Sequence, residues 1–370
     1  MSLQNSLRIS YARFPKVVTS VTPHPPTPYI SIIGSRSFSS QPTYNKRTTT
    51  TTRRPSSMQS SLSRLQQFTN QFSTTTNKMS ENNKNFLLEN VFNVKGKVAL
   101  ITGGGSGIGL MATQALAVNG AKVYIVGRTE EKLENVVKSH GQDIAGEIIP
   151  ITADITKKEE ITRLVKEIES REKCLCILIN NAGISGATQQ TEAGSAEEMK
   201  KNLFDAENST FDDWCDTYRT NVPQLFFMTT AFLPLLQKAT EHQYGYSGTV
   251  INISSISGIV QSSQHHFSYN ASKAAAIHLT KMLASEVANN GVKIRINSIA
   301  PGVFPSEMTA GESGEDQKSH IEKDKYAKVP AKRPGKDEDM AGAILFAATN
   351  QYLNGQTVAV DGGYILHAGA

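Results

Sequence analysis

Cysteine and long apolar runs are both scarce in this 370-residue chain. It has three cysteines, and Cys174 and Cys176 share the apolar run CLCILI, which is not the spacing of a disulfide framework or a metal site. We therefore expect reduced cysteines in a core and no metal ion. No apolar run reaches the roughly 18 residues of a membrane-spanning helix, so we expect no membrane span.

Acidic residues are absent before Glu81, although ten of the 38 Lys and Arg residues lie there. The other 28 basic residues face 33 acidic ones, so the overall charge of +5 comes from a basic leader, residues 1–80. The leader is rich in Ser, Thr and Pro and lacks apolar periodicity, which predicts disorder. It also lacks the aromatic and glycine interleaving of nucleic-acid binders, and the rest of the chain is acidic, so we expect no nucleic-acid partner.

The leader has the Arg-rich, Ser-rich and acid-free composition of a mitochondrial transit peptide. The stretch SRSFSS also resembles a matrix-processing site, with Arg36 two residues before Phe38. This predicts a mitochondrial protein. Two alternatives stay open: an unstructured tail that carries no address, and a cytoplasmic form that starts at Met58 or Met79.

From about residue 93, short β-branched runs alternate with helical segments, a pattern typical of βαβ units. It predicts one α/β domain, residues 93–368, with a doubly wound, Rossmann-like parallel sheet of seven strands. The predicted strands are 97–102, 121–127, 147–153, 174–183, 248–255, 293–302 and 356–363. We expect one long helix over 211–238, a surface insertion over 184–210 and an irregular charged segment over 303–335.

A glycine-rich turn, TGGGSGIG at 102–109, joins the first strand to the first helix. Glycine allows the backbone to turn tightly and approach a phosphate, and the helix N-terminus offers free N–H groups to the anion. A purely structural loop is the alternative, but the position within a βαβ repeat favours a dinucleotide. The candidate binding residues are Gly103, Ser106, Gly107, Ile108 and Gly109.

The end of the second strand distinguishes the two nicotinamide dinucleotides. An acidic residue there would bind the ribose hydroxyls of NAD, but the chain reads IVGR, with Arg128 after Gly127. A guanidinium pairs well with a 2′-phosphate. We therefore expect NADP(H) in preference to NAD(H). The alternative is that Arg128 is a solvated charge at a strand end.

Tyr269 and Lys273 lie four residues apart at the start of an amphipathic helix, and therefore on one face of it. With the glycine-rich turn, NNAG at 180–183 and this YxxxK motif, the chain resembles the short-chain dehydrogenases/reductases over residues 93–367. The resemblance implies that Ser255, three residues before Gly258, is the catalytic serine. Ser254 and Ser257 are its nearest alternatives.

The resemblance also implies roles for residues outside these motifs. Asn221 matches an asparagine of the family's proton relay, and Pro301 and Gly302 match the turn beside the nicotinamide. Phe304 stands where the family usually has Ile or Val, and Ser306 where it usually has Thr. The remaining expected cofactor contacts are Asp154, Ile155, Asn181, Ala182 and Gly183.

A ketone that accepts hydride needs a proton donor, and a phenol with a pKa near 10 is a poor donor at neutral pH. We expect the Lys273 ammonium to lower the pKa of Tyr269 and to bind the nicotinamide ribose. Ser255 would orient the carbonyl. His265 and His266 are expected to be loop residues at the mouth of the site.

The predicted activity is NADPH-dependent reduction of a small-molecule or acyl-thioester ketone. IAPGVFPSEMT resembles the 3-oxoacyl-thioester reductases, and among them the rhamnolipid-pathway type. Steroid or polyol dehydrogenases are an alternative with the same catalytic residues. A non-catalytic dinucleotide sensor is disfavoured, because the four residues Asn221, Ser255, Tyr269 and Lys273 are all present. The resemblance further implies a homodimer or homotetramer.

Overall fold

The computed structural model describes residues 80–321 and 329–370. The predictions made for the leader lie outside the described residues, apart from Ser80. Within the described ranges, no helix is long and apolar enough to cross a membrane. In the same ranges, no group of three or more His, Cys, Asp or Glu side chains could hold a metal ion.

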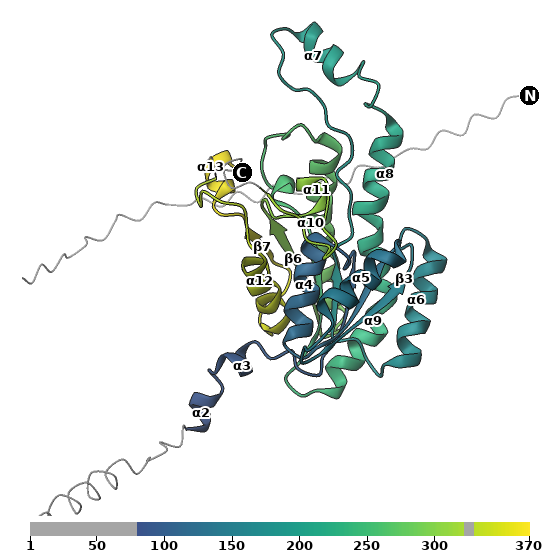
Figure 1. Ribbon diagram of the computed structural model, residues 1–370, viewed down its shortest axis with the longest axis vertical. Coiled ribbons are helices and arrows are strands. Elements are labelled where there is room, and N and C mark those ends of the chain that lie inside the picture. The colour runs from purple at the N-terminus through teal and green to yellow at the C-terminus, as the bar shows by residue number, and fades with distance from the viewer. Residues whose placement is uncertain (1–79, 322–328) are drawn as a thin grey trace, which may run out of the picture. The chain divides into compact units, whose positions relative to one another are not determined.

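Seven strands form one parallel sheet in the order β3-β2-β1-β4-β5-β6-β7 (Figure 1). Every neighbouring pair runs parallel. The strands are β1 (Val98–Thr102), β2 (Lys122–Gly127), β3 (Glu147–Thr152), β4 (Ile177–Asn180), β5 (Gly248–Ile253), β6 (Ile294–Pro301) and β7 (Thr357–Val360). The order reverses direction between β1 and β4, as in a doubly wound fold, and confirms the predicted architecture.

The longer helices connect these strands. They are α4 (Gly107–Val118), α5 (Glu130–His140), α6 (Lys158–Arg171), α8 (Phe211–Asn221), α9 (Pro223–His242), α10 (Phe267–Asn289) and α12 (Asp337–Thr349). Shorter ones are α2 (Glu81–Lys84), α3 (Leu88–Val91), α7 (Ala196–Leu203), η1 (Ile256–Gly258), α11 (Glu307–Ala310) and α13 (Tyr364–Ala368).

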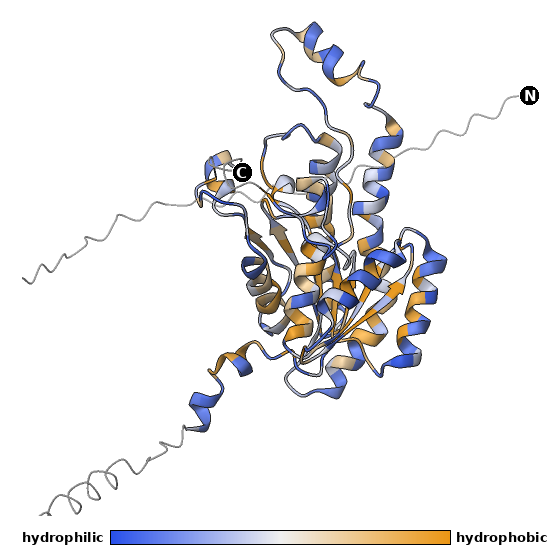
Figure 2. Ribbon diagram, viewed as in Figure 1, coloured by the Kyte–Doolittle hydropathy of each residue, from blue (hydrophilic) through white to orange (hydrophobic). Residues whose placement is uncertain are grey.

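Helices cover both faces of the sheet, because the strands are apolar on both sides (Figure 2). On one face, Ile101 and Ile125 pack with side chains of α4, α5 and α12. On the other, Leu100 and Leu178 pack with side chains of α6, α9 and α10. Successive residues of β1 therefore belong to different cores, which fixes the register of the strand.

The single helix predicted over 211–238 is wrong, because the chain forms two helices there. α8 ends at Asn221, Val222 leaves helical geometry with φ −121° and ψ −66°, and Pro223 begins α9. Proline lacks an N–H and disfavours helical geometry in the residue before it, so it is suited to the first position of a new helix. The break ends α8 beside the catalytic candidates.

Other boundaries also differ from expectation. The strand predicted over 174–183 is ordered as β4 only from Ile177 to Asn180, and the insertion contains the helix α7. The expectation of core cysteines is wrong for Cys215, which is exposed on α8, while Cys176 is buried and Cys174 is partly buried.

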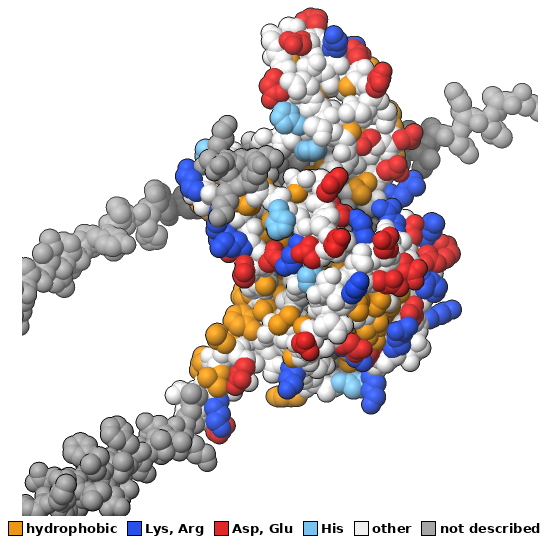
Figure 3. Space-filling view, in the orientation of Figure 1, with side chains coloured by type: hydrophobic (Ala, Val, Ile, Leu, Met, Phe, Trp, Pro, Cys, Tyr) orange, Lys and Arg blue, Asp and Glu red, His pale blue; other side chains and the backbone are white. Residues whose placement is uncertain are grey.

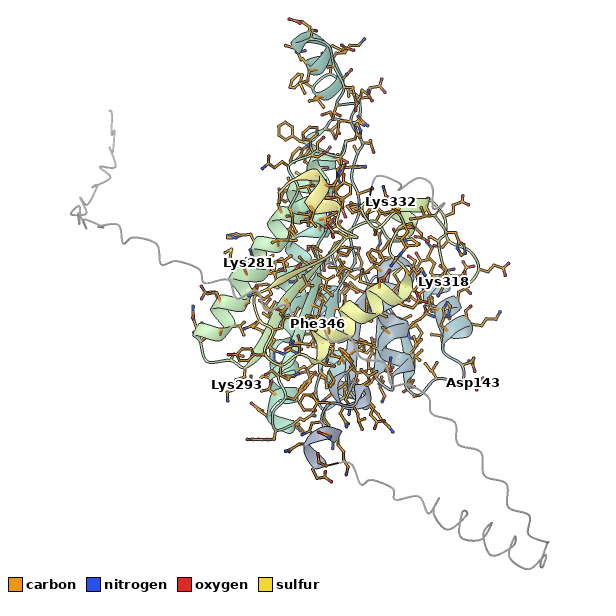
Figure 4. All side chains as sticks on the ribbon, turned by 90° about the vertical axis from the view of Figure 1, so that its left-hand side faces the viewer. Asp143, Lys281, Lys293, Lys318, Lys332 and Phe346 are labelled. Atoms are coloured by element: carbon orange, nitrogen blue, oxygen red, sulfur yellow. The ribbon has the colours of Figure 1, made fainter. Side chains whose placement is uncertain are left out.

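The segment before α12 is connected to that helix by an ion pair of 2.7 Å between Lys318 and Asp337; Figure 4 labels Lys318.

Candidate active site

A cleft of about 360 Å³ opens at the carboxyl ends of the strands. Of the residues expected from sequence to form the site, all except Gly109 and Asn221 line this one cleft. Parallel strands place their carboxyl ends at the same edge of the sheet, so motifs that are far apart in sequence meet there. Gly109 and Asn221 do not line the cleft, but each contacts residues that do.

The glycine-rich turn is packed too tightly for larger residues. A Cβ atom added to Gly109 would lie 2.0 Å from the carbonyl oxygen of Gly103 and 2.5 Å from Asn181 Nδ2. The Asn181 amide itself donates to the carbonyl oxygens of Thr102 and Gly103, at 3.1 and 3.0 Å. The turn after β1 is thus braced by the segment after β4, and the first N–H groups of α4 are left for an anion.

Arg128 lies at the rim of the same cleft, just after β2. It is exposed, and the part of the chain that the structure describes gives it no hydrogen bond or ion pair. An unpaired guanidinium that can approach an anion bidentately fits a phosphate group. Together with the turn, this donor set fits a phosphorylated dinucleotide.

Asp154 follows β3 and accepts hydrogen bonds from the backbone N–H and the hydroxyl of Thr156, at 3.1 and 2.7 Å. These bonds, and Lys157 nearby, lower the pKa of Asp154. The carboxylate is therefore ionised and fixed in orientation at neutral pH. Its neighbour Ile155 is buried and also lines the cleft.

Lys273 and Tyr269 project from the first turns of α10 into the inner end of the cleft. Lys273 is buried, and its ammonium lies 5.5 Å from the centroid of the Tyr269 ring. It donates a hydrogen bond of 3.0 Å to the carbonyl oxygen of Ile253, the last residue of β5. Ser255 lies two residues beyond that strand end, so the strand and the helix deliver the serine, the phenol and the cation to one place.

Burial shifts both titratable groups toward their neutral forms. It lowers the pKa of Lys273 to about 8. It raises the pKa of Tyr269, and the Ser255 hydroxyl works against that rise. The lowering of the Tyr269 pKa by Lys273 that we expected from sequence is therefore wrong in direction, because desolvation of the phenol raises the pKa. At neutral pH the phenol is protonated and Lys273 is an ammonium beside it.

The structure also separates the three serines after β5. Ser254 bonds to the Ser298 hydroxyl at 2.6 Å, and Ser257 bonds to the Gln264 side chain at 2.6 Å. Ser255 accepts a hydrogen bond of 3.1 Å from the N–H of Ser257, and its hydroxyl interacts with Tyr269, so Ser255 is the serine that lies beside the phenol.

Asn221, the last residue of α8, is buried, and its side chain is fully engaged in hydrogen bonds. Its amide bonds both the N–H and the carbonyl oxygen of Ile184, each at 2.9 Å, and donates to the Ser272 hydroxyl at 3.0 Å. Ile184 lines the cleft and Ser272 precedes Lys273 in α10. Asn221 therefore supports the walls of the site rather than facing it.

A protein-family model described as short chain dehydrogenase matches residues 97–317. The chain is a short-chain dehydrogenase. It is 39% identical over 279 residues to the short-chain dehydrogenase/reductase PhomF of Diaporthe leptostromiformis, covering 74% of this chain and 92% of that protein. It is 34% identical over 277 residues to the rhamnolipids biosynthesis 3-oxoacyl-[acyl-carrier-protein] reductase of Pseudomonas aeruginosa, covering 74% and 98%.

Solved structures give the same result for the fold of this short-chain dehydrogenase. It superposes with a TM-score of 0.60 on an NADP active-site complex of RhlG from Pseudomonas aeruginosa, at 30% identity over 74% of this chain and 98% of the other. It superposes equally well on a 7α-hydroxysteroid dehydrogenase complexed with NADH and a 7-oxo bile acid, at 27% identity over 74% and 95%. Structural neighbours thus hold either dinucleotide.

Two features of this short-chain dehydrogenase were not expected from its sequence. Phe304 is almost fully buried, and its ring packs against Gly335, so its side chain is part of the core even though the residue borders the cleft. Lys132 on α5 forms an ion pair of 2.7 Å with Glu307 on α11, and both residues line the cleft. No sequence spacing links these two, because 175 residues separate them.

Proposed function

We propose that this short-chain dehydrogenase reduces a ketone, of the 3-oxoacyl-thioester type, with NADPH as the hydride donor. The observation that carries the proposal is the meeting of Ser255, Tyr269 and Lys273 in one cleft that the glycine-rich turn and Arg128 also line. When bound, NADPH would supply the hydride. The residues of the chain supply the proton, its path and the orientation of the carbonyl.

The Tyr269 hydroxyl is the proton donor in this proposal, since the carbonyl oxygen becomes negative as it accepts hydride. Its raised pKa keeps it protonated before the reaction, and the neighbouring Lys273 ammonium stabilises the phenolate that it leaves. Ser255 donates to the same oxygen and holds the carbonyl in line with the phenol.

The preference for NADP(H) rests on Arg128, which is exposed at the end of β2 beside Gly127. The NADP complex of RhlG supports this choice, and the NADH complex of the 7α-hydroxysteroid dehydrogenase is the competing precedent. The 3-oxoacyl substrate class is supported by the relatives from Thermotoga maritima and Pseudomonas aeruginosa that are named as 3-oxoacyl-[acyl-carrier-protein] reductases.

A dehydrogenase of polyols or steroids is a second candidate. The chain is 32% identical over 277 residues to a galactitol 2-dehydrogenase of Cereibacter sphaeroides. Catalytic residues alone do not separate these substrates, because hydride transfer needs the same acid and cation in each. A non-catalytic sensor is disfavoured, because the arrangement for proton transfer is complete. We also propose a homodimer or homotetramer, and a mitochondrial location directed by the basic leader.

The deciding experiment is a substrate panel with the full chain. Acetoacetyl-CoA, a polyol and a hydroxysteroid would each be tested with NADPH or NADP⁺ and with NADH or NAD⁺, following absorbance of the reduced nicotinamide. We expect oxidation of NADPH by acetoacetyl-CoA at a kcat/KM at least tenfold above that with NADH. Faster turnover of the polyol or steroid would replace the substrate class, and a preference for NADH would overturn the role of Arg128.

A further inference from the structure

The start of the 184–210 insertion, residues 184–191, runs directly from the cofactor-proximal segment after β4 past the catalytic helix. We refer to residues 184–191 as the stem. Ile184, the first residue of the stem, lines the same cleft as Tyr269. The stem has no regular secondary structure. Its position must therefore come from bonds to its surroundings.

Three residues outside the insertion, Asn221, Asp213 and His265, anchor the stem. Asn221 holds Ile184 as described above. Farther along, the N–H of Ala187 donates to Asp213 Oδ1 at 2.8 Å, and the N–H of Gln189 donates to the carbonyl oxygen of His265 at 2.9 Å. The first two anchors come from α8, and the third comes from the loop before α10.

Asp213 differs from the other anchors because it also holds the catalytic helix. Its second oxygen, Oδ2, accepts a hydrogen bond of 3.1 Å from the hydroxyl of Ser268. Ser268 is buried in the first turn of α10 and immediately precedes Tyr269. One carboxylate thus links the stem to the residue next to the proton donor.

The stem leaves no space for another arrangement at this point. Gly186 adopts φ +65°, and a Cβ atom there would lie 2.6 Å from both Ser268 Oγ and Thr217 Oγ1. Backbone and hydroxyl groups are in contact, so a displacement of the stem would be transmitted to α10. The carboxylate also lies at the N-terminus of α10, where the helix dipole favours a negative charge.

We propose that Asp213 is a positioning residue of the reaction, which fixes the stem, and with it Ile184 of the cleft lining, relative to Tyr269 through Ala187 and Ser268. The inference rests on the proposed carbonyl reduction. It adds a residue that touches neither substrate nor cofactor. Since displacements of about 1 Å at a reacting pair can lower rates by about 100-fold, loss of this link should impair substrate turnover while leaving cofactor binding intact.

The test compares Asp213→Ala with Asp212→Ala in the full chain. Asp212 is exposed one residue earlier in α8, and it has no hydrogen bond or ion pair within the described ranges. For Asp213→Ala, which removes both bonds, we expect kcat/KM for the carbonyl substrate to fall about tenfold, mainly through KM, with the Kd for NADPH unchanged within a factor of two. Asp212→Ala should match the wild type in both.

Hydrogen–deuterium exchange provides a readout that does not require activity. Asp213→Ala should speed exchange of the N–H groups of 184–191 and of the first turn of α10, and leave exchange in the glycine-rich turn unchanged. Ser268→Ala removes only the bond between Ser268 and Asp213 and keeps the bond between Ala187 and Asp213. It should therefore lower kcat/KM less than the loss of the Asp213 carboxylate does. In the double variant the two effects should not add, since both remove the same link.

The outcomes separate this inference from the proposed function. A wild-type chain that reduces no carbonyl would reject the proposed function, whereas the exchange comparison would still decide whether Asp213 fixes the stem. Unchanged exchange, unchanged kcat/KM, or effects that add fully in the double variant would each overturn the role of Asp213. If Asp213→Ala does not fold, Ser268→Ala and Ser268→Thr carry the test, with Thr expected to restore turnover.

Discussion

The carboxyl edge of the sheet and the 184–210 insertion are held in place in different ways. Across the edge, buried amides bond from strand to strand and on to α10: Asn180 to Asn252 at 2.9 Å, and Asn252 to Thr280 at 2.9 Å. The bonds of the insertion beyond the stem are exposed and mostly internal, such as the ion pair of 2.7 Å between Lys200 and Asp205.

Surface character follows the same division. α7 carries mixed charges and leaves apolar side chains in solvent, with Phe204 76% exposed (Figure 3). Figure 1 shows α7 beyond the end of α8 and away from the sheet. Buried, paired polar groups cost much to disturb, whereas exposed ones contribute little. We therefore expect substitutions at the edge to impair the proposed reaction and the insertion to tolerate change, except where the stem is anchored.

Removal of the phenol oxygen should have the largest effect. Tyr269→Phe keeps the ring and its packing but removes the proton donor, so we expect kcat to fall by about 10³-fold, within the range of a lost general acid. The rate of NADPH oxidation at saturating substrate measures this fall in kcat. Tyr352→Phe, at a fully exposed tyrosine, is the matched control. If Tyr269→Phe turns over at the wild-type rate, Tyr269 is not the donor.

Lys273→Met should lower activity by about 100-fold but raise stability. Burial lowers the pKa of Lys273 to about 8, so the folded state bears the full desolvation cost of the cation below pH 8. As pH rises from 8 to 10.5 the folded state releases its proton before the unfolded state does, and that cost disappears. The variant should therefore gain up to about 3 kcal/mol at pH 7, and its advantage should shrink above pH 8.

Urea unfolding of the wild type and of Lys273→Met at pH 7 and pH 9.5 measures the difference in their free energies of unfolding. Lys281→Met is the control, since Lys281 is exposed on the same helix and labelled in Figure 4. A variant that is less stable than the wild type at pH 7 would show that the cation is already compensated by its surroundings.

Arg128→Ala should have a smaller effect, confined to cofactor choice. Loss of one charge-assisted contact of about 1.5 kcal/mol should raise KM for NADPH about tenfold and leave KM for NADH unchanged. Lys138→Ala, an exposed cation on α5, serves as the comparison. Equal changes with both dinucleotides would mean that Arg128 does not contact a 2′-phosphate.

Shortening of the insertion should have the smallest effect. Replacing residues 193–207 by a short Gly-Ser linker removes α7 but retains the stem and its three anchors. Because the bonds removed are exposed and lie mostly within the insertion, we expect the thermal midpoint to change by less than about 2 °C and kcat/KM to stay within twofold. A larger loss would show that α7 contributes to the folded site directly.

Much of the site could be predicted because its signals are local. The turn after β1 needs glycines, and Tyr269 and Lys273 need only helical spacing to share a face. The α8–α9 break was missed even though Pro223 marks it, since proline at a first helical position and proline within a helix look alike in sequence; α9 indeed contains Pro234. The Lys132–Glu307 pair gave no signal at all, because nothing in sequence relates α5 to α11.

The sequence by itself determined the strand count and the positions of the motifs, and it predicted Tyr269 and Lys273 as the acid and the cation, since each depends on residue type and short-range periodicity. Only the tertiary structure decided which of Ser254, Ser255 and Ser257 lies beside Tyr269, because that depends on how partners such as Ser298 engage the others. It also decided the direction in which the pKa of Tyr269 shifts, since desolvation depends on all the residues packed around the ring.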